Sequence, residues 1–378
     1  MTSNDRFDLI VVGAGIVGLA HAYTAARRGL RVCVAEKDAA CVGASIRNFG
    51  FITVTGQGAG DTWRRARRAR EVWGTVAPQA GIPAVHHGLY LTAFRPQSLK
   101  VLEEFMATEM AVGCELLPVD EAARRAPALR LEGPHGPAQG VLYSPHEMRV
   151  ESRTAIGQFA RWLSDALGVH FRFGEAVLEV AAPRVRTSRA VLHADRVAVC
   201  TNSELNGLFA ERLSPHGLRL CQLHMMRVRP QPGFRLPGSV MADLSLVRYH
   251  GYSKLPAAQV LRTQIEAEEG ESLAHGIHLI VVQSADGTLV VGDSHHYGPV
   301  LEPFADQRVD ALILRHLHET LNLTEATVTE RWVGTYPSSP VTDCLIDAPD
   351  DATRLVLVTS GTGASTAFGI AEDVFAAW

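Results

Sequence analysis

The sequence predicts an α/β protein in which a parallel, nucleotide-binding sheet carries an inserted second domain of mixed α+β structure. Three observations support this fold class. The chain opens with a strand, a glycine turn and a helix, an acidic residue ends the strand that follows, and a second glycine turn precedes the C-terminal helix. At 378 residues the chain is long enough for two domains and a large core.

The first element is a short apolar strand at residues 8–12, of the kind that is buried on both faces of a parallel sheet. The turn after it carries the spacing G-x-G-x-x-G at Gly13, Gly15 and Gly18. The first glycine allows a tight turn, the second lets backbone approach a pyrophosphate, and the third lets the helix pack close to the strand. The pattern therefore predicts a Rossmann-like dinucleotide site.

The helix opens at Ile16 and Val17 and is followed by a strand that ends at Glu36, with Lys37 next. N–H groups at the start of such a helix bind phosphate oxygens. Glu36 lies 23 residues beyond Gly13, close to the roughly 20 expected for the acid that accepts the ribose hydroxyls. A carboxylate there favours FAD or NAD over NADP.

The last segment of the sequence repeats the order of strand, glycine turn and helix. A strand at residues 355–359 leads into a small-residue turn and then a helix. We expect this turn and the start of its helix to supply further cofactor contacts, from Gly361, Thr362, Gly363, Ala364, Ser365 and Thr366.

Composition excludes several functional classes. The formal net charge of −4 gives no reason to expect nucleic acid or an anionic membrane surface as a partner. No apolar segment reaches the roughly 20 residues that cross a bilayer, and the six scattered cysteines form no C-x-x-C pair. We therefore predict a cytoplasmic protein with reduced thiols and no metal site. The sequence does not indicate an oligomeric state.

Several segments resemble the FAD-dependent amino-acid and amine oxidases, the family that includes D-amino-acid oxidase, glycine oxidase and monomeric sarcosine oxidase. Besides the two glycine turns, they are the loop "CVGASIRNFGFI" at residues 41–52, the segment 168–180 and the segment 196–209. These five matches follow the order of the family and span nearly the whole chain. The resemblance implies FAD as cofactor, which argues against an NAD enzyme.

In that family the loop after the acidic strand passes beside the flavin ring. The resemblance implies that the small residues at 43–45 let backbone approach the ring and that Arg47 and Asn48 bring donors to it. The full set of implied FAD-binding residues is Gly13, Gly15, Ile16, Val17, Gly18, Glu36, Lys37, Ala44, Ser45, Arg47, Asn48, Val177, Thr201, Gly361, Thr362, Gly363, Ala364, Ser365 and Thr366.

One departure from the family concerns how the flavin is held. Sarcosine oxidases attach it through a Cys two residues before a Tyr, and here Gly334 occupies that position in "GTYPSSPVTD". We therefore expect non-covalent FAD. Cys344 falls beyond the motif and is expected to be a buried thiol.

The segments between the flavin-binding pieces are expected to build the substrate side. The predicted division assigns residues 1–85, 144–217 and 331–378 to the FAD-binding domain and residues 86–143 and 218–330 to the substrate-binding domain. Alternation along residues 217–230 places Gln222 and His224 on one face, which we expect to line the cavity, and Asp286-Gly287 predicts a hairpin.

Donors for an anionic substrate group come from the strand-like piece "SLVRYHGY" at residues 245–252 and from neighbouring segments. His295 and His296 are further possible contacts, while the arginines of "WRRARRAR" at residues 63–70 are read as a solvated helix face. The predicted catalytic and substrate-contacting residues are Arg47, Asn48, His224, Arg248, Tyr249, Tyr252 and Arg331.

The resemblance implies oxidation of a small amine, with hydride passing to the flavin and electrons to O2. The pieces "GASIRNFGFI", Gly56-Gln57 and "VGDSHHYG" resemble the branch linked to phosphonate breakdown, which converts 2-aminoethylphosphonate or its N-methyl form to phosphonoacetaldehyde. That branch usually carries Lys-x-Gln where this chain has Gln222 and His224. Alternatives are a glycine, sarcosine or D-amino-acid oxidase, a flavin dehydrogenase that reduces a quinone, and a flavin-bound scaffold without activity.

Overall fold

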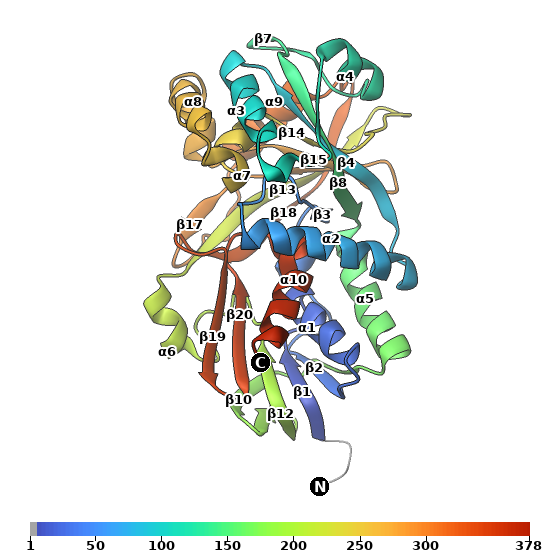
Figure 1. The fold of residues 1–378 in the computed structure, drawn as a ribbon, viewed down its shortest axis with the longest axis vertical. Coiled ribbons are helices and arrows are strands. Elements are labelled where there is room, and N and C mark those ends of the chain that lie inside the picture. Colours follow the sequence, from blue (N-terminus) through green and yellow to red (C-terminus); the bar gives the residue numbers. More distant parts are fainter. Residues whose placement is uncertain (1–5) are drawn as a thin grey trace.

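The computed structural model describes residues 6–378, which form two lobes stacked along the long axis of the molecule (Figure 1). The lobe that contains the C-terminal helix is built on an eight-stranded sheet, and the other lobe on a ten-stranded sheet. Among the described residues, no helix is long and apolar enough to cross a membrane.

The eight-stranded sheet confirms the predicted nucleotide-binding core. Five parallel strands run in the order β9-β2-β1-β12-β20, and β10, β11 and β19 add antiparallel pairs at the sides. The apolar run of β1 is buried throughout residues 9–12, as expected for a strand covered on both faces. The strands are β1 (Arg6–Val12), β2 (Val32–Glu36), β9 (His170–Phe173), β10 (Val177–Ala181), β11 (Arg184–Thr187), β12 (Val191–Val199), β19 (Cys344–Asp350) and β20 (Thr353–Val358).

Helices α1 (Ile16–Ala26), α2 (Asp61–Gln79), α5 (Ser152–Leu167) and α10 (Gly363–Ala376) pack together beside this sheet (Figure 1). α1 lies close to β1 because residue 18 has no side chain: a Cβ on Gly18 would lie 1.9 Å from the carbonyl oxygen of Gly13. Three arginines of α2 pair with acids of α10, for example Arg64 with Asp373 at 2.6 Å, which indicates a helix face rather than an anion site.

The ten-stranded sheet follows the order β17-β13-β16-β15-β14-β4-β8-β3, with β18 paired to β13 and β5 to β8. It is antiparallel except for the pair of β14 with β4. The predicted hairpin is confirmed, since β15 and β16 pair across Gly287. The strands are β3 (Phe51–Ile52), β4 (Ala84–Ala93), β5 (Glu115–Leu117), β8 (Gly140–Val150), β13 (Arg219–Pro230), β14 (Ser239–Met241), β15 (Ile280–Gln283), β16 (Leu289–Gly292), β17 (His296–Gly298) and β18 (Ala326–Ser338).

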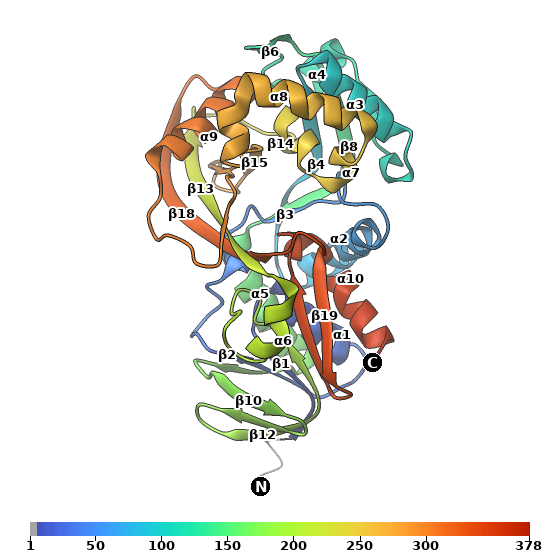
Figure 2. The same cartoon turned by 90° about the vertical axis from the view of Figure 1, so that its left-hand side faces the viewer.

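Helices α8 and α9 cover the side of this sheet that faces away from the first lobe, with α3 and α4 beside them (Figure 2). A separate pair, β6 (Glu132–Gly133) with β7 (Gly136–Pro137), lies at the far end. The remaining helices are α3 (Pro96–Met106), α4 (Val119–Arg125), α6 (Ala210–Leu213), α7 (His250–Ser253), α8 (Pro256–Ala274) and α9 (Gln307–Thr320), with 3₁₀ turns η2 (Ala44–Ile46), η3 (Glu109–Ala111), η4 (Ser214–His216) and η5 (Asp243–Val247).

Strand pairing bears on the predicted division of the chain. Residues 51–52, 144–150 and 331–338, which that division places with the FAD-binding domain, lie on strands of the ten-stranded sheet. β18 pairs with β13 along residues 326–338, and its contacts with β20 and η2 connect the second sheet to the first lobe. The domain boundaries themselves stay a prediction.

Candidate active site

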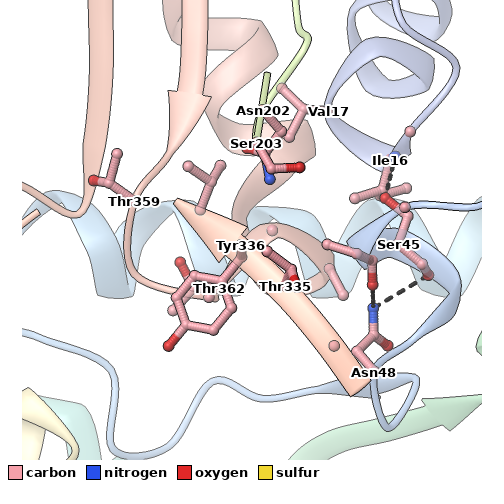
Figure 3. A pocket seen from close by; sticks show the side chains of 18 of the residues that line it. Ile16, Val17, Ser45, Asn48, Asn202, Ser203, Thr335, Tyr336, Thr359 and Thr362 are labelled. Atoms are coloured by element: carbon pink, nitrogen blue, oxygen red, sulfur yellow. Dashed lines mark hydrogen bonds between the residues drawn. The ribbon is translucent and has the colours of Figure 1, made fainter. Parts of the chain in front are cut away.

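A cavity of about 670 Å³ lies where the two sheets meet, and segments of both line it (Figure 3). Its volume falls within the range of roughly 300–1,000 Å³ that is usual for ligand sites. One end is formed by the glycine turn after β1 and the ends of β2 and β12, and the other by residues that follow η5 and β16. The cavity therefore joins the predicted nucleotide site to the predicted substrate side.

The glycine turn is held against β2 and β12. Gly13 has φ +103°, and a Cβ there would lie 2.7 Å from the carbonyl oxygen of Cys200. The Glu36 carboxylate accepts hydrogen bonds from the backbone N–H groups of Ala14 at 2.8 Å and Asp38 at 3.1 Å. Glu36 thus lines the cavity as an anchored anion beside the turn, where it can also accept ribose hydroxyls.

The loop between β2 and β3 closes over this turn. Ser45 Oγ accepts the N–H of Ile16 at 2.9 Å (Figure 3). Asn48 Nδ2 donates to the carbonyl oxygens of Ala44 at 2.9 Å and Ser45 at 3.1 Å, and Asn48 Oδ1 accepts the N–H of Gly50 at 2.7 Å. The Asn48 amide is therefore engaged in holding the loop, so its role is to position the residues around it.

Arg47 lines the cavity from an exposed position on the same loop. Its carbonyl oxygen accepts the indole N–H of Trp332 at 3.0 Å, which ties the loop to β18. The guanidinium is thus placed where it can approach a ligand, while its backbone is fixed.

The C-terminal turn lies on the same cavity, as predicted. Gly361 has φ +74°, and a Cβ there would lie 3.0 Å from the ring of Tyr336. Ser365 Oγ accepts the N–H of Thr53 at 3.0 Å, whereas Thr366 lies behind the lining and bonds to the carbonyl oxygen of Thr362 at 3.0 Å. Gly18 is likewise outside the lining, because its role is helix packing.

The lining fits a dinucleotide with a polar ring. Asn202 Oδ1 and Gln57 Nε2 are buried atoms of lining residues, and neither has a hydrogen-bond partner among the described residues. Buried polar groups of this kind need a partner, and a flavin with its ribose supplies both donors and acceptors. The predicted cofactor contacts that line the cavity are Gly13, Gly15, Ile16, Val17, Glu36, Lys37, Ala44, Ser45, Arg47, Asn48, Val177, Thr201, Gly361, Thr362, Gly363, Ala364 and Ser365.

At the other end of the cavity Arg248 is half-buried and donates to the hydroxyl of Tyr297 at 3.1 Å. Among residues 6–378, no carboxylate forms an ion pair with it within 4 Å. Tyr249, His250 and Tyr336 line the cavity with it. Asp293 of the same lining interacts with Arg248 electrostatically but forms no ion pair with it, so the guanidinium is suited to an anionic ligand.

The predicted strand at residues 245–252 is wrong. The segment forms η5 and α7, because its backbone groups bond locally: the N–H of Tyr249 donates to Ser245 at 3.0 Å and that of Tyr252 donates to Tyr249 at 2.9 Å. Residues that would alternate on a strand are thus brought together, and Arg248, Tyr249 and His250 all face the cavity.

Tyr252 lies outside the cavity. It is fully buried against Phe105, with ring centroids 4.8 Å apart, and under Gly56. A Cβ on Gly56 would lie 2.6 Å from its ring. Tyr252 is therefore a packing residue beneath the loop that carries Gln57.

The predicted face of β13 is also wrong. Leu223 lines the cavity, while Gln222 and His224 point away from it. His224 Nδ1 lies 2.9 Å from Asp310 Oδ1, and Arg331 Nε donates to Asp310 Oδ2 at 2.8 Å, so these two predicted site residues share an acid of α9 instead. Successive strand residues face opposite sides, so an error of one residue exchanges the whole set.

His278, Asp293 and His295 form a cluster on the cavity, and of these the sequence indicates only His295. All three are buried and line the cavity, and their nearest nitrogen and oxygen atoms lie within 4.8 Å of one another. Burial alone would raise the pKa of Asp293, but the two imidazoles and Arg248 outweigh it and lower that pKa to about 2. Burial lowers the pKa of His278 and holds that of His295 well below its ordinary value.

No signal in the sequence joins these residues, because they come from the segments before β15 and after β16. Tyr297 and Tyr336 were missed for the same reason. His296, the neighbour of His295, lies outside the cavity and contacts His275, with the two nitrogens 3.0 Å apart.

Comparisons with known proteins place the chain in a family. No curated protein sequence matches it significantly. Among solved structures it is similar to glycine oxidase from Geobacillus kaustophilus, with 17% identity, a TM-score of 0.77 and coverage of 98% of this chain and 94% of that one. It is also similar to L-proline dehydrogenase from P. horikoshii, with 17% identity, a TM-score of 0.77 and coverage of 97% and 92%.

A third similar structure is the FAD-bound L-alpha-glycerophosphate oxidase from Mycoplasma pneumoniae, with 15% identity, a TM-score of 0.73 and coverage of 98% and 94%. At these identities the similarity establishes the fold. Residues 8–377 match the profile of the family described as FAD dependent oxidoreductase, which is nearly the whole chain. The chain therefore belongs to the DAO family of FAD-dependent oxidoreductases.

Proposed function

We propose that this FAD-dependent oxidoreductase is an amine oxidase for a small amine that carries an anionic group, and that the substrate is 2-aminoethylphosphonate or its N-methyl form. The observation that carries the proposal is Arg248, a guanidinium that lines the cavity without a carboxylate partner among the described residues. A cavity-lining guanidinium with no ion pair of its own is suited to bind an anion.

The surroundings of Arg248 support a phosphonate. The hydroxyls of Tyr249, Tyr297 and Tyr336 and the imidazole of His250 belong to the same cavity lining. A phosphonate has three oxygens in a tetrahedral arrangement, so it can use several donors in addition to a guanidinium. A planar carboxylate would leave more of them unused.

The chain's own residues bind and orient the substrate and exclude water from the site. FAD, when bound, accepts the hydride that leaves the carbon bearing the amine and passes the two electrons to O2. Arg248 anchors the anionic end, while Phe49, Phe51, Leu223 and Ile280 give that part of the cavity an apolar lining. Holding the amine in a water-poor site lowers the barrier through orientation.

The overall reaction balances as follows. The amine, O2 and water give phosphonoacetaldehyde, H2O2 and ammonia, or methylamine when the substrate carries an N-methyl group. Water attacks the imine that forms once hydride has left, and the carbon–nitrogen bond then breaks.

A small amino acid is the second candidate substrate. It is favoured because the Arg248 guanidinium is sufficient by itself for one carboxylate, and a structural neighbour is named glycine oxidase. The reaction class and the use of FAD would be unchanged. An electron acceptor other than O2 would leave the same site but give little H2O2.

Matched pairs of substrates distinguish the two candidates. We expect kcat/KM for 2-aminoethylphosphonate to exceed that for β-alanine by on the order of 10²-fold, because the carboxylate leaves donors unpaired. The measurement is H2O2 release across 2-aminoethylphosphonate, N-methyl-2-aminoethylphosphonate, β-alanine, glycine, sarcosine and D-alanine. Higher values for the carboxylates would refute phosphonate recognition.

We also propose that FAD is held without a covalent bond. Gly334 has no side chain to offer, and its Cβ position would lie 3.3 Å from the carbonyl oxygen of Arg47. Cys41 lines the cavity, but burial raises the pKa of its thiol to about 11, and burial also raises the pKa of Cys200. Protonated thiols are poor nucleophiles.

Acid precipitation should therefore release the flavin. We expect the absorbance near the flavin maximum to appear entirely in the supernatant, with a colourless pellet. A yellow pellet that survives washing in denaturant would show a covalent link.

A further inference from the structure

We propose that His295, supported by Asp293 and His278, is the group that takes the proton from the substrate's ammonium before oxidation. The proposal rests on the proposed function, because it assigns the amine end of the same substrate. Hydride can leave an amine-bearing carbon only when the nitrogen lone pair is free, so a protonated amine must first lose a proton.

The hydrogen bonds of His295 determine where it can accept a proton. Its Nδ1 lies 2.9 Å from the carbonyl oxygen of Gly276. A carbonyl oxygen can only accept, so Nδ1 carries the hydrogen and the neutral ring has its lone pair at Nε2. That Nε2 lies 3.8 Å from Asp293 Oδ2. A proton taken up at Nε2 would form an ion pair with that carboxylate, which stabilises the imidazolium.

Asp293 is prepared to stabilise the imidazolium that forms. Its side chain is 6% exposed, and His278 Nε2 lies 3.0 Å from its Oδ1. That oxygen nevertheless accepts no well-formed hydrogen bond among the described residues. The ring of His278 stacks on that of His295 with centroids 5.0 Å apart. The cluster therefore holds one fixed negative charge beside two imidazoles.

Arg248 lies in the same part of the cavity, and Tyr297 connects it to His295. The Tyr297 hydroxyl accepts from Arg248 at 3.1 Å, and the Tyr297 ring stacks on His295 with centroids 6.3 Å apart. The site thus presents a cation and an anion to a substrate that carries both charges. The anionic end is expected at Arg248 and the ammonium at the His295 cluster.

Substrate binding would itself prepare the base. Burial is the largest cause that lowers the pKa of His295, and the positive charge of Arg248 is the next. An anionic group on Arg248 cancels that second effect, so the affinity of His295 for a proton rises when substrate is in place. Besides the three members of the cluster and Arg248, the titratable groups around it are Tyr249, Tyr297, Tyr336 and Cys221.

The proton step balances without a further reactant. The N–H bond of the ammonium breaks, its electron pair stays on nitrogen, and the proton forms a bond to His295 Nε2. The neutral amine is then competent to lose hydride, and the imidazolium returns its proton to solvent after product leaves. A divalent cation among the same three side chains is disfavoured, because the Arg248 guanidinium already places a positive charge on this cavity.

The test is His295→Gln, with His296→Gln as its matched control. Glutamine can still donate to the carbonyl oxygen of Gly276 but cannot hold a proton. Flavin reduction by substrate is followed anaerobically in a stopped-flow instrument as a function of pH, and visible absorbance shows that each variant retains FAD. In wild type and His296→Gln the rate should be independent of pH from the pKa of His295 beside the ammonium up to its higher pKa beside the neutral amine.

For His295→Gln we expect a rate that is at least tenfold lower at neutral pH and rises about tenfold per pH unit, since the neutral amine must then come from solution. A substrate whose amine is less basic, 2-amino-1,1-difluoroethylphosphonate, should restore much of the rate at neutral pH. For Asp293→Asn the rate of flavin reduction should also rise with pH, but less steeply, because the variant removes only the charge that stabilises the imidazolium.

Other outcomes would overturn the assignment. A His295→Gln profile parallel to wild type, or a loss that neither pH nor the fluorinated amine relieves, would show that His295 only supports the structure. Inactivation by EDTA with recovery on adding Zn²⁺ would place a metal at these atoms instead. Failure of every amine to reduce the wild-type flavin would refute the proposed function itself, and that result is distinct from these.

Discussion

Replacing Arg248 with methionine should lower kcat/KM for the anionic substrate by about 10²–10³-fold, because loss of one partner of an enclosed charge pair costs roughly 2–5 kcal/mol. The free enzyme should lose little stability, since Arg248 forms no ion pair among the described residues and Asp293, which its charge also influences, keeps the two imidazoles beside it. Steady-state kinetics and thermal unfolding together measure the two effects. The loss should be smaller for Arg248→Lys, which keeps the charge but not the planar fork of donors.

The matched control is Arg331→Met. Sequence alone makes Arg331 a candidate for the anion site as well, but it lies outside the cavity lining and its guanidinium pairs with Asp310 of α9 at 2.8 Å. We expect kcat/KM to stay within about twofold of wild type for a partly exposed pair of this kind. Equal losses in the two variants would mean that Arg248 does not contact the substrate.

Replacing Glu36 with alanine should weaken FAD binding by about 10²-fold, so that the protein purifies largely colourless. The carboxylate accepts backbone N–H groups of Ala14 and Asp38 and lies beside the glycine turn. Hydrogen bonds to a charged group are worth about 1.5–3 kcal/mol each, and those to the ribose would be lost as well. Fluorescence titration of the apoprotein with FAD measures the change.

Two further variants make that prediction specific. Glu36→Gln keeps one acceptor oxygen and should bind FAD with an affinity between those of wild type and Glu36→Ala. Glu179→Ala removes an exposed acid of the same sheet, which pairs with Arg186 at 3.0 Å on the surface, and should leave FAD affinity unchanged. Full retention of FAD by Glu36→Ala would contradict the assigned nucleotide site.

The parts of the fold that the sequence predicts are those encoded within one continuous segment. The glycine spacing after β1 requires close packing that only glycine permits, since a Cβ on Gly18 would overlap the backbone of Gly13. At the turn of Gly361 and the hairpin of Gly287 the reason is a positive φ, +74° and +84°, which favours glycine. In these places local chemistry decides the structure.

The substrate side was harder to predict because it depends on which segments meet. Residues 245–252 alternate like a strand, yet local hydrogen bonds make them two helical turns. His224 was placed on the cavity, but it faces Asp310, since alternation alone does not say which face of β13 is inside. His278 and Asp293 lie on different segments, and only the assembled sheet brings them together.

The proposed enzyme binds an amine whose anionic end contacts Arg248 and oxidises that amine with FAD. The most direct measurement is bleaching of the flavin absorbance when wild-type protein is mixed anaerobically with substrate. We predict that 2-aminoethylphosphonate or its N-methyl form bleaches the flavin, with phosphonoacetaldehyde as the product and H2O2 once air is admitted. A flavin that glycine, sarcosine or D-alanine bleaches, while both phosphonates leave it oxidised, would contradict the account.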